Sequence, residues 1–436
     1  MSNTPKIRFN GYQDEWQADK FSSIFTLLKN NTLSRAELND EEGNAQNIHY
    51  GDILIKFGEY LDAEKEDIPF ITSDELAEKL SSFALQNGDV IIADTAEDST
   101  VGKCTEIGNI SEDMPVVSGL HTIPVRPNAD FASGYLGYFM NSNAYHDQLV
   151  PLMQGTKVSS IAKTYLGDTN IHFPEEVSEQ EKISLFLHYL SDLIVAQQKR
   201  QEKLLAFRSA CLDKMFPRNG SLCPEIRFSG FTDDWKVRRV KDLVVDGIID
   251  APMDGNHGEK HPKASDYVVE GIPFLMASDI HNGCADTHSC QHITQERALA
   301  LDKGFAINGD VLLTHKATIG ETAILKNLEC EFAMLTPQVT YYRVKDASKL
   351  DREYLYAFFN SYDFQAELKE KAAQSTRAYI GISAQRALNI LLPQNVIEQA
   401  KIGSFFVMLD ELISHHDSQL RKLNQFKKSI LHNMFV

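Results

Sequence analysis

The side chains that could support catalysis or metal binding are few in this chain. Cysteine and histidine gather once, where Cys284, His288, Cys290 and His292 lie close together with His281 nearby. Structural zinc sites pair CxxC-like knuckles, and this spacing is irregular. We therefore expect a polar loop here and no metal site. Six cysteines in 436 residues fit free thiols in a reducing compartment.

The sequence also lacks the motifs that carry common enzyme chemistry. It holds no GxxxxGK[ST], GxGxxG, HExxH or GxSxG, and no Asn-Pro-Pro-aromatic tetrad of adenine methyltransferases. The stretch NGDVIIADTAEDSTVGK could suggest nucleotide binding through Asp94, Asp98 and Gly102, but a turn with Lys103 near phosphate or solvent is the favoured alternative. We expect a non-catalytic chain that binds no cofactor.

Two polar loops carry residues suited to nucleic acid. QGTKVSSI and QSTRAYIG each place a cation shortly after a glutamine. Phosphates are bound by Lys, Arg, Ser and Thr, and base edges by Arg, Lys, Asn and Gln, although a plain surface loop is the alternative. The candidate contacts are Gln154, Thr156, Lys157, Ser159, Ser160, Gln374, Ser375, Thr376, Arg377 and Tyr379. Lys56, Lys103, Thr314, His315 and Lys316 are further candidates, for which a structural role is at least as well supported.

These loops belong to a chain that is written twice. PKIRFNGYQDEW returns 219 residues later as PEIRFSGFTDDW, with seven of twelve positions identical and the only two tryptophans, Trp16 and Trp235, aligned. We expect both tryptophans to be packing anchors. Two further blocks repeat at the same offset, and the sequence between the blocks diverges. These blocks are Tyr135–Leu149 with Tyr354–Leu368, and Pro174–Phe216 with Pro393–Phe435.

The third block predicts a long helix in each half. Apolar residues recur at a spacing near 3.5, behind Pro174 and Pro393, which is coiled-coil periodicity. About 40 residues give a rod of roughly 60 Å. Gln197, Gln201 and His416 are polar positions on this seam, either fixing register or tolerated at the surface. The seam residues are Ile183, Leu187, Leu190, Ile194, Leu204, Met215, Ile402, Phe406, Leu409, Ile413, Leu423 and Met434.

The diverged interiors predict strands, turns and short helices. NIHYGDILIKF, NGDVIIADT, HTIPVRP, GDVLLTHKAT and TPQVTYYRV are rich in strand-forming residues, and the acidic run 59–78 fits a solvated loop. The predicted fold is α+β, with two pseudo-symmetric globular domains, each followed by a long helix, and the two helices paired as an antiparallel coiled coil. The expected divisions are 1–173, 174–217, 218–392 and 393–436.

Charge and hydropathy limit the function further. The net charge of −18 opposes general binding to DNA, so local basic patches or basic partners would be needed. No stretch approaches about 18 uncharged apolar residues. The opening MSNTPKIRFNGYQDEW has no apolar signal segment, and we expect the protein in the cytoplasm.

The order of these phrases resembles the specificity (S) subunit of type I restriction–modification systems. The resemblance rests on the PxIRFxGF openings, IHYGDI, NGDVIIADTAED, SGLHTIPVRP, QGTKVSSI, LTPQVTYYR and helices ending LxxMF, and it covers essentially the whole chain. It implies two target recognition domains, each reading one half of an asymmetric bipartite DNA site. It also implies a helical spacer that docks two modification (methyltransferase) subunits, with restriction (translocase/endonuclease) subunits joining. S-adenosylmethionine, ATP and Mg²⁺ would be used by those partners.

Two other classes of protein stay open from the sequence. A free-standing regulator would have to bind DNA alone, against the negative charge. A scaffold of helices would show no DNA preference, and it leaves unexplained why the interiors diverged while the repeated blocks persisted.

Overall fold

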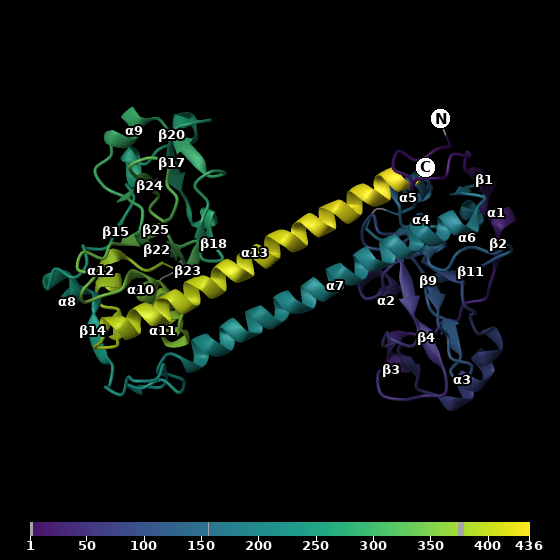
Figure 1. Ribbon diagram of the computed structural model, residues 1–436, viewed down its shortest axis with the longest axis horizontal. Helices are drawn as coiled ribbons and strands as arrows, with labels where there is room; N and C mark the ends of the chain where they lie inside the picture. The colour runs from purple at the N-terminus through teal and green to yellow at the C-terminus, as the bar shows by residue number, and fades with distance from the viewer. Residues whose placement is uncertain (1–2, 156, 374–378) are drawn as a thin grey trace. The chain divides into compact units, whose positions relative to one another are not determined.

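The computed structural model describes residues 3–155, 157–373 and 379–436 (Figure 1). The chain folds into two compact units. Unit 1 contains Met1–Gln198 and Leu420–Val436, and unit 2 contains Lys199–Gln419. The two long helices, α7 (Val177–Lys214) and α13 (Val396–Met434), are therefore each divided between the units.

Unit 1 is built on a five-stranded sheet whose centre is buried. The central strand β7 is rich in Val and Ile, and neither it nor its neighbour β9 has an exposed residue. The order is β2 (Phe25–Leu27), β11 (Thr122–Pro127), β7 (Val90–Ala93), β9 (Cys104–Gly108) and β5 (Tyr60–Asp62). A second sheet has the order β10 (Val116–Ser118), β4 (Gln46–Ile48), β6 (Phe70–Ile71) and β3 (Leu38–Asn39). Two short pairs are β1 (Gln17–Lys20) with β13 (Asn170–Phe173) and β8 (Thr95–Ala96) with β12 (Ser159–Ser160). The short helices are α1 (Phe21–Ile24), α2 (Tyr50–Ile55), α3 (Asp74–Leu80), α4 (Tyr135–Met140), α5 (Asn143–Leu149) and α6 (Lys163–Leu166).

Unit 2 divides its strands between two sheets in another arrangement. One has the order β15 (Met253–Asp254), β25 (Val339–Tyr342), β22 (Val311–Lys316) and β23 (Thr318–Ile324). The other has the order β16 (Tyr267–Val268), β20 (Gln291–Ile293), β17 (Ile272–Leu275), β24 (Ala333–Leu335) and β21 (Phe305–Ala306). The short pairs are β14 (Lys236–Arg239) with β26 (Asn389–Leu392) and β18 (Ile280–His281) with β19 (Cys284–Ala285). The short helices are α8 (Val240–Val245), α9 (Gln295–Leu299), α10 (Arg352–Phe359), α11 (Tyr362–Ala373) and α12 (Ile382–Arg386).

Two predictions for the N-terminal interior were wrong. The stretch 47–57 is a strand only up to Ile48, and residues 50–55 form α2. The His49 ring caps this helix by accepting the Gly51 amide at 3.2 Å, and such a cap favours a helix over a strand. The acidic run 59–78 contains β5, β6 and the first turn of α3, because apolar residues between the charges are buried.

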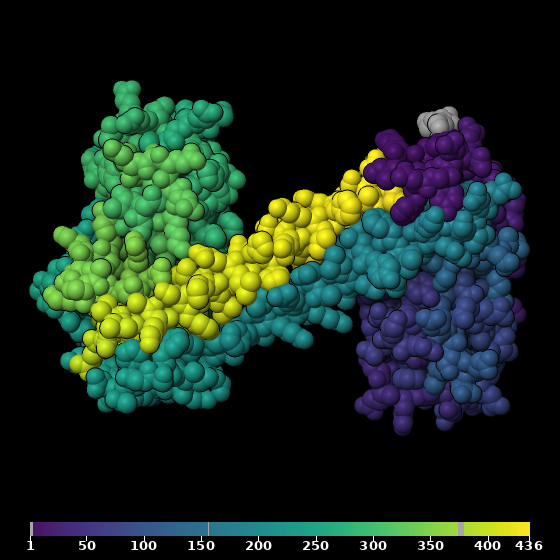
Figure 2. Space-filling view, in the orientation of Figure 1, coloured from purple at the N-terminus to yellow at the C-terminus, as the bar shows by residue number. Residues whose placement is uncertain are grey.

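The repeated opening of each half packs against the end of the long helix from the other half. In unit 1, the Ile7 amide donates to the Asn433 carbonyl at 2.9 Å, close to the end of α13. In unit 2, the Ile226 amide donates to the Lys214 carbonyl at 2.9 Å, at the end of α7. These are the same bond, displaced by one repeat. Figure 2 shows the last turns of α13 (yellow) against N-terminal residues (purple) in unit 1.

The tryptophans are packing anchors at these junctions, as predicted. Trp16 is 2% exposed, with its ring 6.2 Å from Phe435 in a T-shaped contact. Trp235 is 1% exposed, with its ring 6.1 Å from Phe216. Each unit is therefore completed by the helix end that belongs to the other repeat.

The long helices run antiparallel, as predicted. In unit 1 the start of α7 shares a hydrophobic cluster with the end of α13, through Ile183 and Met434. In unit 2 the end of α7 shares a cluster with the start of α13, through Met215 and Ile402. The buried seam residues are Ile183, Leu187, Leu190, Ile194, Met215, Ile402, Phe406, Leu409 and Met434, and the half-buried ones are Leu204, Ile413 and Leu423.

The polar seam positions are at least half-buried. Gln201 Nε2 donates to the Ile413 carbonyl at 3.4 Å, and His416 is 7% exposed. Burial lowers the pKa of His416. No helix in the described ranges is long and apolar enough to span a membrane.

Candidate nucleic-acid interface

Both units place polar side chains where a central strand ends beside a turn. In unit 1 this strand is β7, and the Asp94 amide that follows it donates to the His121 carbonyl at 3.1 Å. In unit 2 the strand is β22, and the His315 amide donates to the Gln338 carbonyl at 2.9 Å. The same backbone position therefore holds Asp94 in one unit and His315 in the other.

The described ends of the two predicted polar loops, at residues 160–161 and 379–380, pair with the same strand ends. The Ile161 amide donates to the Asp94 carbonyl at 2.9 Å, and the Ile380 amide donates to the His315 carbonyl at 3.1 Å. Next along the chain, Ser160 pairs with Thr95 through β8 and β12. At the equivalent position Tyr379 pairs with Lys316 in an isolated bridge. The structure therefore places these candidates at equivalent positions beside the end of a central strand. They are Ser160 in unit 1 and Tyr379, His315 and Lys316 in unit 2.

An aspartate–arginine pair fixes the base of each strand. In unit 1 the Arg126 guanidinium donates to both carboxylate oxygens of Asp89, each at 2.7 Å. In unit 2 Arg343 donates to Asp310 at 2.8 and 2.7 Å. Both aspartates are buried and belong to the repeated NGD phrase. The backbone of the two sites is therefore held by the same interactions.

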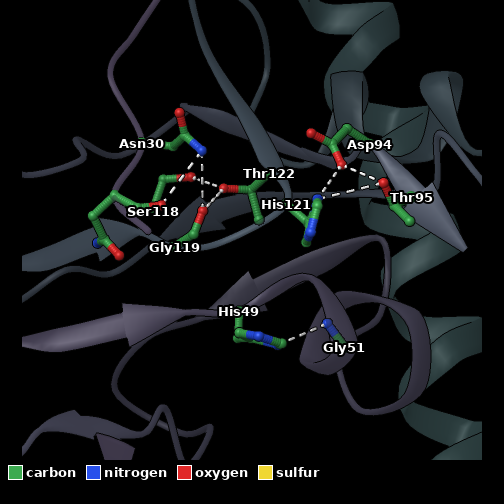
Figure 3. A network of polar contacts seen from close by, with 10 residues as sticks. Asn30, His49, Gly51, Asp94, Thr95, Ser118, Gly119, His121 and Thr122 are labelled. Carbon is green, nitrogen blue, oxygen red and sulfur yellow. Dashed lines mark hydrogen bonds and ion pairs between the residues drawn. The ribbon is translucent and has the colours of Figure 1, made fainter. Parts of the chain in front are cut away.

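The unit 1 cluster is drawn in Figure 3. His121 Nδ1 lies 3.2 Å from Asp94 Oδ1, and the Thr95 hydroxyl donates to the same oxygen at 2.7 Å. The ring of Tyr50 meets the His121 ring edge-on at 5.3 Å. His121 lies in the turn before β11 with a φ of 54°, and its side chain is 47% exposed.

Hydroxyl groups hold the turn that carries His121. The Thr122 hydroxyl donates to the Gly119 carbonyl at 2.6 Å, and the Ser118 and Thr122 hydroxyl oxygens lie 2.6 Å apart (Figure 3). The Asn30 amide also donates to the Gly119 carbonyl, at 3.3 Å. The turn is thus held from two sides.

The unit 2 site is a small cavity of about 270 Å³. Gln338 Oε1 accepts the Ala277 amide at 3.2 Å, which turns its NH₂ group away from that amide. His257 Nε2 lies 2.7 Å from Asp254 Oδ2, and Asp254 also accepts from Lys303. The cavity is lined by His257, Gly258, His261, Met276, Lys316, Thr336, Pro337 and Gln338.

His315 directly precedes Lys316, which lines this cavity. Its side chain is fully buried, its ring is 5.5 Å from that of Tyr379, and neither ring nitrogen has a hydrogen-bond partner in the described part of the chain. Burial lowers the pKa of His315 to about 4, so the ring is neutral at pH 7.

The other sequence candidates lie in several environments. Lys157 is exposed, and Gln154 Nε2 donates to the Tyr165 hydroxyl at 3.3 Å. Lys103 Nζ donates to the Leu54 carbonyl at 3.0 Å and its burial lowers the pKa, while Lys56 donates to the Asp67 carbonyl. Thr314 is buried and accepts the Glu321 amide at 3.0 Å; Ser159 is half-buried in β12. Thr156, Gln374, Ser375, Thr376 and Arg377 lie outside the described residues. All these contacts with DNA stay predictions.

Sequence reasoning named Asp94 only in a disfavoured nucleotide-binding alternative, and it did not single out His121 or Gln338. A signal was present, because Asp94 and His315 each stand five residues after the aspartate of an NGD phrase. Their partners His121 and Gln338 directly precede β11 and β25, and the pairing of those strands with β7 and β22 brings them together. Within the described ranges, no three His, Cys, Asp or Glu side chains are grouped to hold a metal ion. The chemistry that these clusters offer is hydrogen bonding.

These features define a class of tandem α+β proteins with paired long helices and two unlike polar sites on one backbone plan. The family model of the type I restriction modification DNA specificity domain matches residues 13–206 and again residues 232–425. The chain belongs to this family and carries its domain twice.

Individual relatives are distant. The chain is 22% identical to the type I restriction enzyme MjaVIII specificity subunit of Methanocaldococcus jannaschii, over 64% of each chain. It is 24% identical to the EcoKI specificity subunit of Escherichia coli, over 71% of this chain and 66% of that subunit. These matches span just under two thirds of the relatives' own lengths. The crystal structure of a type I restriction–modification S subunit from M. genitalium has the same fold, with a TM-score of 0.61 at 12% identity and 99% of both chains covered.

Proposed function

We propose that this chain recognises an asymmetric bipartite DNA site and directs modification and restriction subunits to it. One observation carries the proposal. The two units keep the same backbone hydrogen bonds around Asp94 and His315, and they place unlike polar side chains there. A repeated frame with different side chains suits the reading of two different short sequences. The chain performs no catalysis and binds no cofactor, and it acts in the cytoplasm.

The long helices offer two equivalent surfaces for partners. On α7 the side chains of Tyr189 and Leu193 are 67% and 44% exposed. On α13 their counterparts one repeat later, Met408 and Leu412, are 64% and 41% exposed. Large apolar side chains one helical turn apart form an exposed stripe on each helix, and such stripes mark protein contacts.

Two equivalent stripes fit two copies of one partner. We assign them to two methyltransferase subunits, which use S-adenosylmethionine. Restriction subunits, which use ATP and Mg²⁺, complete the complex. Partners with basic DNA-facing surfaces also explain how a chain of net charge −18 reaches the duplex, because phosphate contacts require Lys and Arg.

The test is to co-express the chain with its methyltransferase subunits and to map methylated adenines in host DNA. We expect a motif of two unlike half-sites separated by a fixed gap. A single continuous motif, or methylation without sequence preference, would contradict the proposal. Tight binding of the isolated chain to DNA at physiological salt, in a gel-shift measurement, would favour a free-standing regulator instead.

The docking surfaces have a test of their own. Tyr189→Ser combined with Leu193→Ser is expected to remove one methyltransferase subunit from the complex, as measured by native mass spectrometry. Val195→Ser, an exposed residue on the opposite face of the same helix, is the matched control. Retention of both subunits by the double variant would show that the stripe is not the docking surface.

A further inference from the structure

The side chains at the two equivalent strand ends differ in hydrogen-bonding character. Thr95 and Lys316 occupy equivalent positions, because they pair with Ser160 and Tyr379 of the two polar loops. His121 and Gln338 occupy equivalent positions, because their carbonyls accept the amides of Asp94 and His315. If these positions served packing alone, the repeat would be expected to keep similar residues there, as it keeps the Asp89–Arg126 pair. The substitutions are instead polar for polar, at positions that are half-buried (Thr95, Gln338) or exposed (His121, Lys316).

Unit 1 presents acceptors at this place. The Asp94 carboxylate can only accept, and its Oδ1 already takes the Thr95 hydroxyl. When His121 donates from Nδ1 to Asp94, its Nε2 becomes an acceptor. The complementary groups on a base edge are exocyclic amines, which are N4 of cytosine and N6 of adenine.

Unit 2 presents donors at the same place. The Lys316 ammonium is exposed on the cavity wall and can only donate. Gln338 accepts the Ala277 amide with its oxygen, which leaves its NH₂ group directed away from that amide and able to donate to a ligand. The equivalent of Asp94 is His315, which is buried and offers no carboxylate. Two donors side by side match O6 and N7 of guanine.

We propose that Asp94 and His121 form the base-reading centre of unit 1, and that Lys316 and Gln338 form the base-reading centre of unit 2. The unit 1 centre accepts a hydrogen bond from an exocyclic amine of a base. The unit 2 centre donates hydrogen bonds to the edge of a guanine. This inference rests on the proposed function. It assigns specificity to four residues that do not lie in the polar loops 154–161 and 374–381.

The experiment uses the whole chain in complex with its methyltransferase subunits, after the wild-type motif has been mapped. Exchange variants give a position the side chain of its backbone equivalent in the other unit, as Lys316→Thr with Gln338→His, and as Thr95→Lys with His121→Gln. We expect each to lower methylation of the original motif roughly 5- to 150-fold, through altered preference in one half-site only, and in opposite halves for the two variants.

A second arm removes a single acceptor from the DNA. Replacing guanine by 7-deazaguanine, one position at a time, should weaken binding in the half-site affected by the unit 2 exchange. In the half-site read by unit 1, the same replacement should leave binding unchanged at each position where the unit 1 centre accepts from an exocyclic amine. Lys349→Thr, an exposed lysine of unit 2 that does not line the cavity, is the control.

The outcomes separate the inference from the proposed function. If the wild-type complex shows no bipartite motif, the proposed function fails and the inference fails with it. If the motif is bipartite and both exchange variants methylate it with unchanged preference, only the inference fails. Lys316→Met alone is a second test, because one change at an exposed position disturbs folding less than an exchanged pair. If this variant keeps the guanine preference of the wild type, the assignment is overturned.

Discussion

The repeat retains a buried ion pair at the start of each long helix. Arg8 Nε lies 2.6 Å from Glu179 Oε1, and Arg227 Nε lies 2.6 Å from Glu398 Oε1. Both glutamates are 1% exposed and stand in the first turn of their helices, where a negative charge is favoured. The arginine joins the opening segment of each half to its own helix, and hydrogen bonding to the glutamate raises the pKa of Arg8 and Arg227.

Removing one partner of this pair leaves a buried charge alone. We expect Arg227→Met to lower the free energy of unfolding of unit 2 by about 3–5 kcal/mol, measured by urea titration with Trp235 fluorescence in a Trp16→Phe background. Arg238→Met is the control, because its partner Asp246 is half exposed and such pairs contribute about 1 kcal/mol or less. Equal losses of unfolding free energy in the two variants would show that the burial of Glu398 does not determine the size of the effect.

His315 predicts a pH dependence of stability. Its pKa is about 4 in the folded chain and about 6.5 when unfolded, so the unfolded state binds more protons between these values. Stability is therefore lost as the pH falls below 6.5, by about 2 kcal/mol at pH 5, and the loss levels off below the folded pKa.

The measurement compares the unfolding of unit 2 at pH 7.5 and pH 5. His315→Gln is expected to be less sensitive to this change than the wild type, by about 2 kcal/mol. Other histidines with lowered pKa, such as His261, titrate in both proteins and cancel in the comparison. Parallel pH profiles would mean that the His315 ring is hydrated or protonated in the folded state.

The long helices act as core elements as well as a pair. The end of α13 places Phe435 against Trp16, Tyr135 and Phe139, with ring centroids 6.2, 5.9 and 5.8 Å apart. The end of α7 places Phe216 in the same way in unit 2. Much of the apolar face that the heptad pattern predicts is therefore buried in globular cores.

Shortening the aromatic residue at a helix end should weaken the unit that it completes. Phe435→Ala is expected to destabilise unit 1 by about 3–5 kcal/mol, because it opens a cavity among aromatic rings. Trp16 fluorescence in a Trp235→Phe background reports this loss. Phe426→Ala, on the same helix and 48% exposed, should change little. A small effect of Phe435→Ala would indicate that the junction with α13 adds little to the stability of unit 1.

The two compact units are interleaved along the chain. Unit 2 is continuous in sequence from Lys199 to Gln419, whereas unit 1 needs the last segment, Leu420–Val436, to complete its core. That segment supplies Ile430, Met434 and Phe435 to the cluster around Trp16. The units therefore differ in how a truncation affects them.

Deletion of residues 420–436 is expected to unfold unit 1 selectively. Loss of three buried apolar side chains, at about 2–5 kcal/mol each, is comparable to the whole stability of about 5–15 kcal/mol of most domains. Hydrogen exchange followed by mass spectrometry should show fast exchange in β7 and β9 and retained protection in β22 and β25. Full protection of β7 in the truncated chain would contradict this division of the core.

The sequence by itself determined the duplication, the two long helices and the aligned tryptophans, because repeats and helical periodicity are local signals that need no partner. It did not determine which helix end fills which core. The LxxMF endings are alike in both repeats, so local chemistry favours neither assignment, and the connections of the folded chain decided it. The polar centres likewise depended on tertiary structure. Asp94 meets His121, and His315 meets Gln338, only through strand pairings across more than twenty residues, which no local pattern specifies.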